Sequence, residues 1–124
     1  AYREVSRRAV FDDTYRELKS NLSAVRQEAL SGVRPAGCTG PLTAYRVTFT
    51  ASSYAAAAVC GATINTRSFN LPTSVTFTTR PVSISYKVIA DGVTIVGGNT
   101  ITVQTTVGGT QTRTITINNQ GLIQ

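Results

Sequence analysis

The chain has 124 residues and a net charge of +6, with twelve basic residues, six acidic residues and no histidine. This length fits one domain with a single core, so we expect residues 1–32 to supply a helix and residues 33–124 a β-rich head. Without histidine, the chain lacks the residue that most often serves as a general base and that commonly binds zinc. It also has no apolar run of about twenty residues that could span a membrane.

The N-terminal segment Val5–Gly32 has a helical pattern. Six apolar residues follow one another at spacings of three or four, which places them on one side of an α-helix. This apolar stripe consists of Phe11, Tyr15, Leu18, Leu22, Val25 and Ala29. Because no second helix is predicted, we expect the stripe to pack on a sheet. Upstream of Phe11 the same spacing reaches Arg8 and Arg7, so we expect the helix to project beyond the domain there.

The end of the helix is well marked. Gly32 can take the left-handed conformation that ends a helix, and Pro35 prevents the helix from resuming. The residues from Arg34 to Pro41 then favour a loop.

After this loop the hydrophobic period changes to two. Tyr45, Val47 and Phe49 alternate with polar residues, and the alanine-rich segment Tyr54–Cys60 is expected to pair back and pack closely against the helix. Asp91 and Gly92 predict a tight hairpin turn. The other predicted strands are Ile64–Phe69, Ser74–Thr78, Val82–Val88, Val93–Val96, Ile101–Val107 and Arg113–Asn118. The sequence therefore predicts an α+β fold with one long N-terminal helix on antiparallel sheet of about eight short strands.

Cys38 and Cys60 are the only cysteines. A disulfide between them would tie the helix exit to the first hairpin, contribute about 3 kcal/mol and indicate an oxidising compartment, periplasmic or extracellular. Two free thiols or a metal pair are the alternatives, but two cysteines without histidine cannot complete a zinc site. We expect the disulfide and no metal.

The residue types that catalysis needs are poorly represented. Five of the six carboxylates lie in the helical segment, and the sixth, Asp91, has a structural role in a predicted turn. The two lysines, Lys19 and Lys87, have no catalytic motif around them, and the paired glycines are too short for a phosphate loop. We therefore expect no enzymatic activity and no cofactor.

Several short motifs occur in an order that resembles a known family. They are Ala24-Val25-Arg26-Gln27-Glu28-Ala29-Leu30 followed by Gly32, Tyr45 and Val47 with Tyr54, Leu71-Pro72 before Val75-Thr76-Phe77, and Arg113-Thr114-Ile115-Thr116-Ile117-Asn118 with Gly121. Together with the N-terminal helix, they make nearly the whole chain resemble type IV pilin-like minor pilins and pseudopilins of the GspH/FimT type. The resemblance is to an ectodomain that lacks the hydrophobic N-terminal half-helix.

This resemblance implies a structural subunit of a type IV pilus, a type II secretion system or a DNA-uptake filament. It also implies a precursor cut by a prepilin peptidase, an anchor in the inner membrane upstream of this sequence, and a periplasmic head that later joins an extracellular filament. Other pilins or pseudopilins would be the partners, through the N-terminal helix. The candidate filament contacts are Val5, Ala9 and Val10, which lie off the apolar stripe and have ordinary helix surface as the alternative interpretation.

DNA is the alternative partner, because some FimT-like proteins bind it through a C-terminal Gly-Arg-x-Arg. The corresponding segment here, Gly121-Leu122-Ile123-Gln124, has no arginine. Other basic residues of the head could form a different basic face, although a modest positive bias of the surface is the favoured interpretation. These candidate DNA contacts are Arg46, Arg67, Arg80, Lys87 and Arg113. A carbohydrate or adhesion module ranks last, because Tyr2 is the only tyrosine outside the predicted core pattern.

Overall fold

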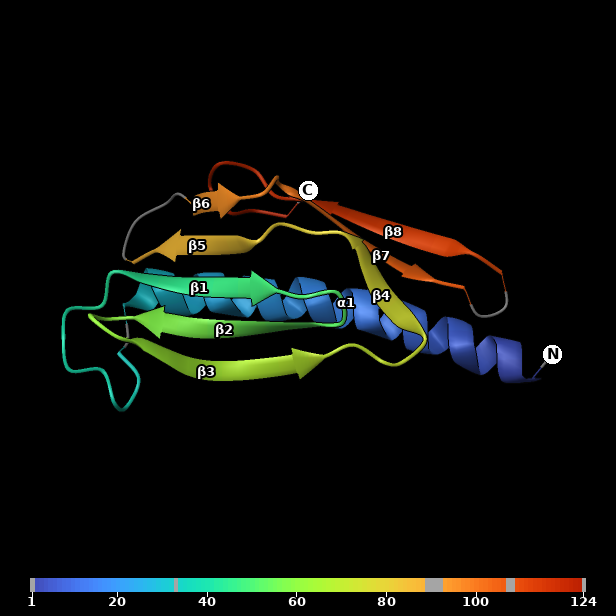
Figure 1. The fold of residues 1–124 in the computed structure, drawn as a ribbon, viewed down its shortest axis with the longest axis horizontal. Coiled ribbons are helices and arrows are strands. Elements are labelled where there is room, and N and C mark those ends of the chain that lie inside the picture. The colour runs from blue at the N-terminus through green and yellow to red at the C-terminus, as the bar shows by residue number, and fades with distance from the viewer. Residues whose placement is uncertain (1, 33, 89–92, 107–108, 124) are drawn as a thin grey trace.

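A computed structural model describes residues 2–32, 34–88, 93–106 and 109–123, and for residues 2–9 it describes the backbone alone. The described residues form one N-terminal helix and eight antiparallel strands (Figure 1), which confirms the predicted α+β class. The elements are α1 (Tyr2–Ser31), β1 (Ala44–Phe49), β2 (Ser53–Val59), β3 (Thr63–Asn70), β4 (Val75–Thr79), β5 (Ser83–Lys87), β6 (Val93–Val96), β7 (Thr100–Thr105) and β8 (Gln111–Thr116).

The strands form two sheets. The five-stranded sheet has the order β3-β2-β1-β5-β6, and the three-stranded sheet has the order β4-β7-β8. The chain therefore leaves the first sheet after β3, enters the second at β4, and returns at β5 to pair with β1 (Figure 1). The hairpin predicted at Asp91 and Gly92 lies outside the described residues, although β5 and β6 do pair.

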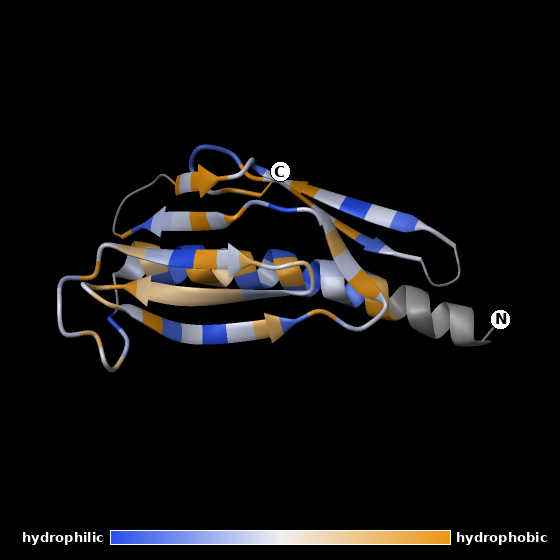
Figure 2. Cartoon of the chain, viewed as in Figure 1, coloured by the Kyte–Doolittle hydropathy of each residue, from blue (hydrophilic) through white to orange (hydrophobic). Residues whose placement is uncertain are grey.

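Helix α1 begins at Tyr2, three residues before the predicted Val5, and ends as predicted, with Gly32 in the left-handed conformation at a φ of 69°. Five of the six stripe residues are buried and Tyr15 is partly buried against the same core. Figure 2 shows apolar bands recurring along α1 and alternating with polar residues along the strands. The sheets contribute Tyr45, Val47, Phe49, Ala56, Ala58, Ile84 and Tyr86 from one and Val75, Phe77, Ile101, Val103 and Ile115 from the other.

The helix lies closer to β1 and β5 than to the alanine-rich strand β2, so it does not sit across the first hairpin alone. Ala56 and Ala58 of β2 are nevertheless fully buried. Arg67 of β3 lies opposite Ala56 in the strand register and pairs with Glu28 of the helix. The small alanine side chains leave room for this ion pair between the helix and the outer strand.

Val82 departs from the predicted strand Val82–Val88. The pattern places it on the buried row with Ile84 and Tyr86, but its side chain is 64% exposed and β5 begins one residue later. The reason is the passage between the sheets: Pro81 is buried where the chain crosses from β4 to β5, and Val82 still belongs to that crossing. A change of direction breaks the alternation that a continuous strand would keep.

The predicted disulfide is present between Cys38 and Cys60, whose Cα atoms lie 5.7 Å apart. The bond joins the loop after α1 to the end of β2, and the Gly40 N–H donates to the Cys60 carbonyl at 3.2 Å. It therefore fixes the helix exit to the five-stranded sheet.

The C-terminal segment is held against the helix and β5. The Asn118 side-chain oxygen accepts the N–H groups of Gln120 and Leu122, each at 2.9 Å, and Arg26 Nε donates to the Gln120 carbonyl at 3.1 Å. Gly121 has a φ of 81° and is buried so close to Tyr86 that a Cβ atom there would lie 2.9 Å from the Tyr86 ring. These contacts cover the end of the core beside Tyr86 of β5 and Arg26 of α1.

Candidate functional site

The five candidate DNA contacts do not converge. Arg46 and Lys87 lie on the outer face of the five-stranded sheet, where their neighbours in β1 and β5 alternate with buried residues. Arg46 Nε donates to Ser85 Oγ at 3.3 Å. Arg67 and Arg113 instead point toward α1, from β3 and β8 respectively, and each pairs with a helix carboxylate.

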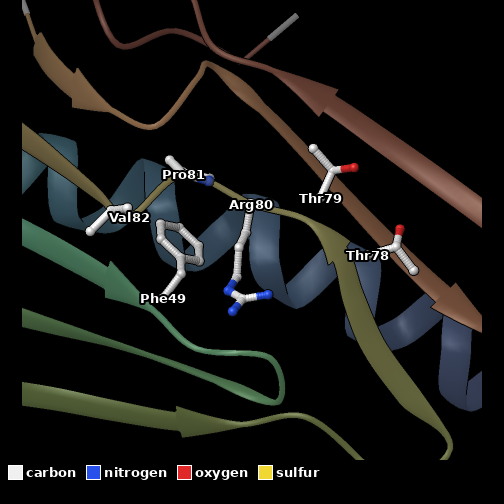
Figure 3. A pocket seen from close by; sticks show the side chains of 6 residues that line it. All are labelled: Phe49, Thr78, Thr79, Arg80, Pro81 and Val82. Carbon is white, nitrogen blue, oxygen red and sulfur yellow. The ribbon is translucent and has the colours of Figure 1, made fainter.

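Arg80 lies in a third place, the crossing between β4 and β5. Figure 3 shows its side chain beside the Phe49 ring, in an open cavity of about 350 Å³ that Pro81 and Val82 also line. The cavity lies between the two sheets and carries a single cation. Neither this cavity nor the outer sheet face therefore gathers the basic residues that a DNA phosphate backbone would require.

A second group of cations meets at a groove between α1 and β8. The groove has a volume of about 210 Å³, and its lining residues are Asp12, Tyr15, Arg16, Lys19 and Arg113. Tyr15 is central, because Lys19 Nζ lies 5.2 Å and Arg113 Cζ lies 5.8 Å from its ring centroid, within reach of cation–π attraction. Arg113 also pairs with Asp12 at 3.2 Å. We call this site the basic groove.

The sequence prediction named Arg113 but missed Arg16 and Lys19. Their spacing along the helix could have identified them. Residues three and four apart on a helix lie side by side, and this spacing places Asp12, Tyr15, Arg16 and Lys19 on one flank. The spacing could not predict that β8 lies beside this flank of the helix. The groove needs both elements.

The candidate filament contacts lie at the N-terminal part of α1. Val10 is 41% exposed, whereas the side chains of Val5 and Ala9 fall outside the described part of the chain. Thr14, one turn further on, is buried and its hydroxyl donates to the Val10 carbonyl at 2.8 Å. The exposed Val10 therefore lies directly beside Phe11, where the buried stripe begins.

The pKa shifts that stand out belong to buried tyrosines. Burial raises the pKa of Tyr86 to about 12, and a smaller effect of Arg26 opposes the rise. Burial also raises the pKa of Tyr45 and of Tyr54, whose hydroxyl accepts a bond from Asn21 at 2.9 Å. All three hydroxyls stay protonated at neutral pH. The described residues also contain no group of three His, Cys, Asp or Glu side chains able to hold a metal ion.

Comparison with known proteins found no match to the chain among family models, curated proteins or solved structures. In the part of the chain that the structure describes, no helix combines the length and the apolar character needed to cross a membrane.

Proposed function

We propose that the chain is a non-catalytic subunit of a type IV pilin-like filament, a minor pilin or pseudopilin that assembles through the N-terminal part of α1. The observation that carries this proposal is the division of the helix. Its core stripe begins at Phe11, yet the helical backbone begins at Tyr2 and runs on past the five-stranded sheet and β4 to the far end of the molecule (Figure 1). A helix that extends beyond its own core offers side chains to neighbouring subunits.

Two further features support the same role. The Cys38–Cys60 disulfide fits a head that folds in an oxidising compartment, such as the periplasm. The order of motifs from Ala24 to Gly121 resembles the GspH/FimT type. In this proposal a segment upstream of Ala1 anchors the subunit in the inner membrane before assembly.

Cysteine cross-linking in the producing cells tests the proposal. Val10→Cys places a thiol on the exposed part of the helix, and Thr48→Cys places one on the exposed outer face of β1 as a matched control. We expect Val10→Cys to give cross-linked subunits in the fraction sheared from the cell surface, and Thr48→Cys to give far fewer. Equal yields from the two variants, or no cross-links at Val10, would reject assembly through this helix.

DNA binding through a basic sheet face is not advanced as a second function. Arg67 and Arg113 are paired with carboxylates, and Arg46, Lys87 and Arg80 lie on other parts of the surface. Duplex DNA therefore enters the experiments below as a competing ligand of the basic groove.

A further inference from the structure

The exposed surface of α1 carries opposite charges on its two flanks. At 100° per residue, Arg16 and Lys19 face the side of the helix on which β8 lies, where the basic groove is formed. Asp13 and Glu17 are exposed and lie one turn apart on the other flank. We call these two carboxylates the acidic ridge. The same stretch of about two helical turns therefore presents a cationic groove and an anionic ridge.

The basic groove has more positive charge than it neutralises. It contains three cations and one carboxylate, and Asp12 makes its ion pair with Arg113. Arg16 and Lys19 have no ion pair within the described part of the chain, and Lys19 of α1 and Arg113 of β8 both lie within cation–π reach of the Tyr15 ring. Half of the Arg113 side chain surface remains exposed, at 51%. The groove can therefore accept carboxylates from outside the molecule.

The acidic ridge has the opposite imbalance. The sequence has six acidic residues against twelve basic ones, and both Asp12 and Glu28 are paired with arginines. Asp13 and Glu17 form no ion pair with any described residue. In a chain with a net charge of +6, two neighbouring carboxylates that face solvent are available to a cationic partner.

We propose that the basic groove of one copy binds the acidic ridge of a second copy of this chain. The spacing fits, because carboxylates four residues apart rise about 6 Å along the helix and the cations Arg16 and Lys19, three residues apart, rise about 4.5 Å. Since groove and ridge are different surfaces, the contact is heterologous, and each bound copy keeps one free groove or one free ridge. Repetition of the contact builds an open row of subunits. The inference rests on the proposed function, since it names the contact between copies in the filament.

Charge reversal on one side at a time tests the contact. The groove variant is Arg16→Glu with Lys19→Glu, and the ridge variant is Asp13→Lys with Glu17→Lys. Each alone opposes like charges across the contact, so we expect the yield of inter-chain photochemical tyrosine–tyrosine cross-links, a chemistry that none of the substitutions removes, to fall about tenfold in purified protein at low salt. A matched control, Arg46→Glu with Lys87→Glu, makes the same charge change on the outer sheet face and should leave the yield unchanged.

Mixing the variants gives the decisive result. The groove variant keeps its acidic ridge and the ridge variant keeps its basic groove, so a mixture should restore the inter-chain cross-links that neither variant forms alone. A chain with all four substitutions should form rows again. One protein labelled with heavy nitrogen identifies the inter-chain peptides by mass spectrometry. The proposal is overturned if the mixture forms no pairs, or if the outer-face control reduces cross-linking as much as the groove variant.

Three other outcomes separate this inference from its alternatives. If the groove variant loses retention of duplex DNA at low salt and shows no change in inter-chain cross-links, the groove binds phosphates and the inference is wrong. If Val10→Cys cross-links persist in the sheared fraction while the charge variants have no effect, the filament role stands and this contact fails. If purified chains give ridge-to-groove cross-links but Val10→Cys gives none in cells, the contact stands and the filament role fails.

Discussion

The two halves of α1 differ in what their side chains face. From Leu18 to Ala29, every third or fourth residue is at most 2% exposed and packs on the sheets. Before Leu18 the buried positions are Phe11 and Thr14, while Val10 is exposed and charged residues line the basic groove. One continuous helix thus combines a half that holds the domain together with a half that presents charge and apolar surface to other molecules. The predictions below test this division.

The largest expected effect is in the packed half. Leu22→Ala should lower the free energy of unfolding by about 3 to 5 kcal/mol, because Leu22 is only 1% exposed within the core and the truncation leaves a cavity there. Val10→Ala should change it by less than about 0.5 kcal/mol, because this side chain is partly in water. Urea denaturation measures both, and similar losses for the two variants would contradict the division of the helix.

The disulfide comes next in size. Replacing both Cys38 and Cys60 by serine should cost about 3 kcal/mol, because the bond closes a loop of 22 residues in the unfolded chain. Since the bond fixes the exit of the packed half to β2, hydrogen exchange should increase mainly near Ser31 and in β2. Increased exchange confined to the N-terminal half would show that the disulfide does not anchor the packed half.

Substitution of Gly121 tests how tightly the C-terminal segment packs against the core beside the packed half of the helix. Gly121→Ala should cost about 2 kcal/mol or more, since it combines a φ of 81° with a Cβ placed 2.9 Å from the Tyr86 ring. Gly98→Ala is the control: its φ is 102° and nothing lies within 4 Å of the added Cβ, so about 1 kcal/mol is expected. Thermal denaturation of the two variants isolates the contact with Tyr86, and equal losses would mean that the contact is absent.

The smallest effect concerns the Tyr86 hydroxyl, which is buried with no hydrogen-bond partner among the described residues. Tyr86→Phe should raise the free energy of unfolding by about 1 kcal/mol at pH 7, because it removes an unsatisfied polar group. In the parent chain the folded pKa of about 12 lies above the ordinary value of 10.0, so the unfolded state releases its proton first. The contribution of the protonated Tyr86 to the free energy of unfolding is therefore fully present below pH 10. It falls by about 1.4 kcal/mol per pH unit between pH 10 and 12.

Denaturation measured across this pH range checks the sign. Tyr86→Phe should lose stability less steeply than the parent, with the remaining slope due to Tyr45 and Tyr54, whose pKa values are also raised. An unchanged slope would mean that the hydroxyl is already ionised or solvated in the folded state.

Local patterns were sufficient for the elements themselves. The spacing of Phe11, Leu18, Leu22, Val25 and Ala29 predicts the buried side of the helix, and Gly32 predicts its end, because both depend on neighbours within one or two turns. The Cys38–Cys60 disulfide followed from the sequence because only one pairing is possible. The start of the helix was less certain, since a polar first turn has no apolar period to read.

Contacts between distant segments required the tertiary structure. The chain itself determined one amphipathic helix, about eight short strands and one disulfide, since these follow from periodicity, turn residues and cysteine count. Only the folded structure shows that β1 pairs with β5, although β4 of the other sheet lies between them in the sequence. It also shows that Val82 faces outward where the chain crosses between the sheets, and that β8 brings Arg113 to Tyr15 and Lys19. The physical reason is that side-chain period fixes which face a residue takes within one element, whereas packing of the whole core fixes which elements lie together.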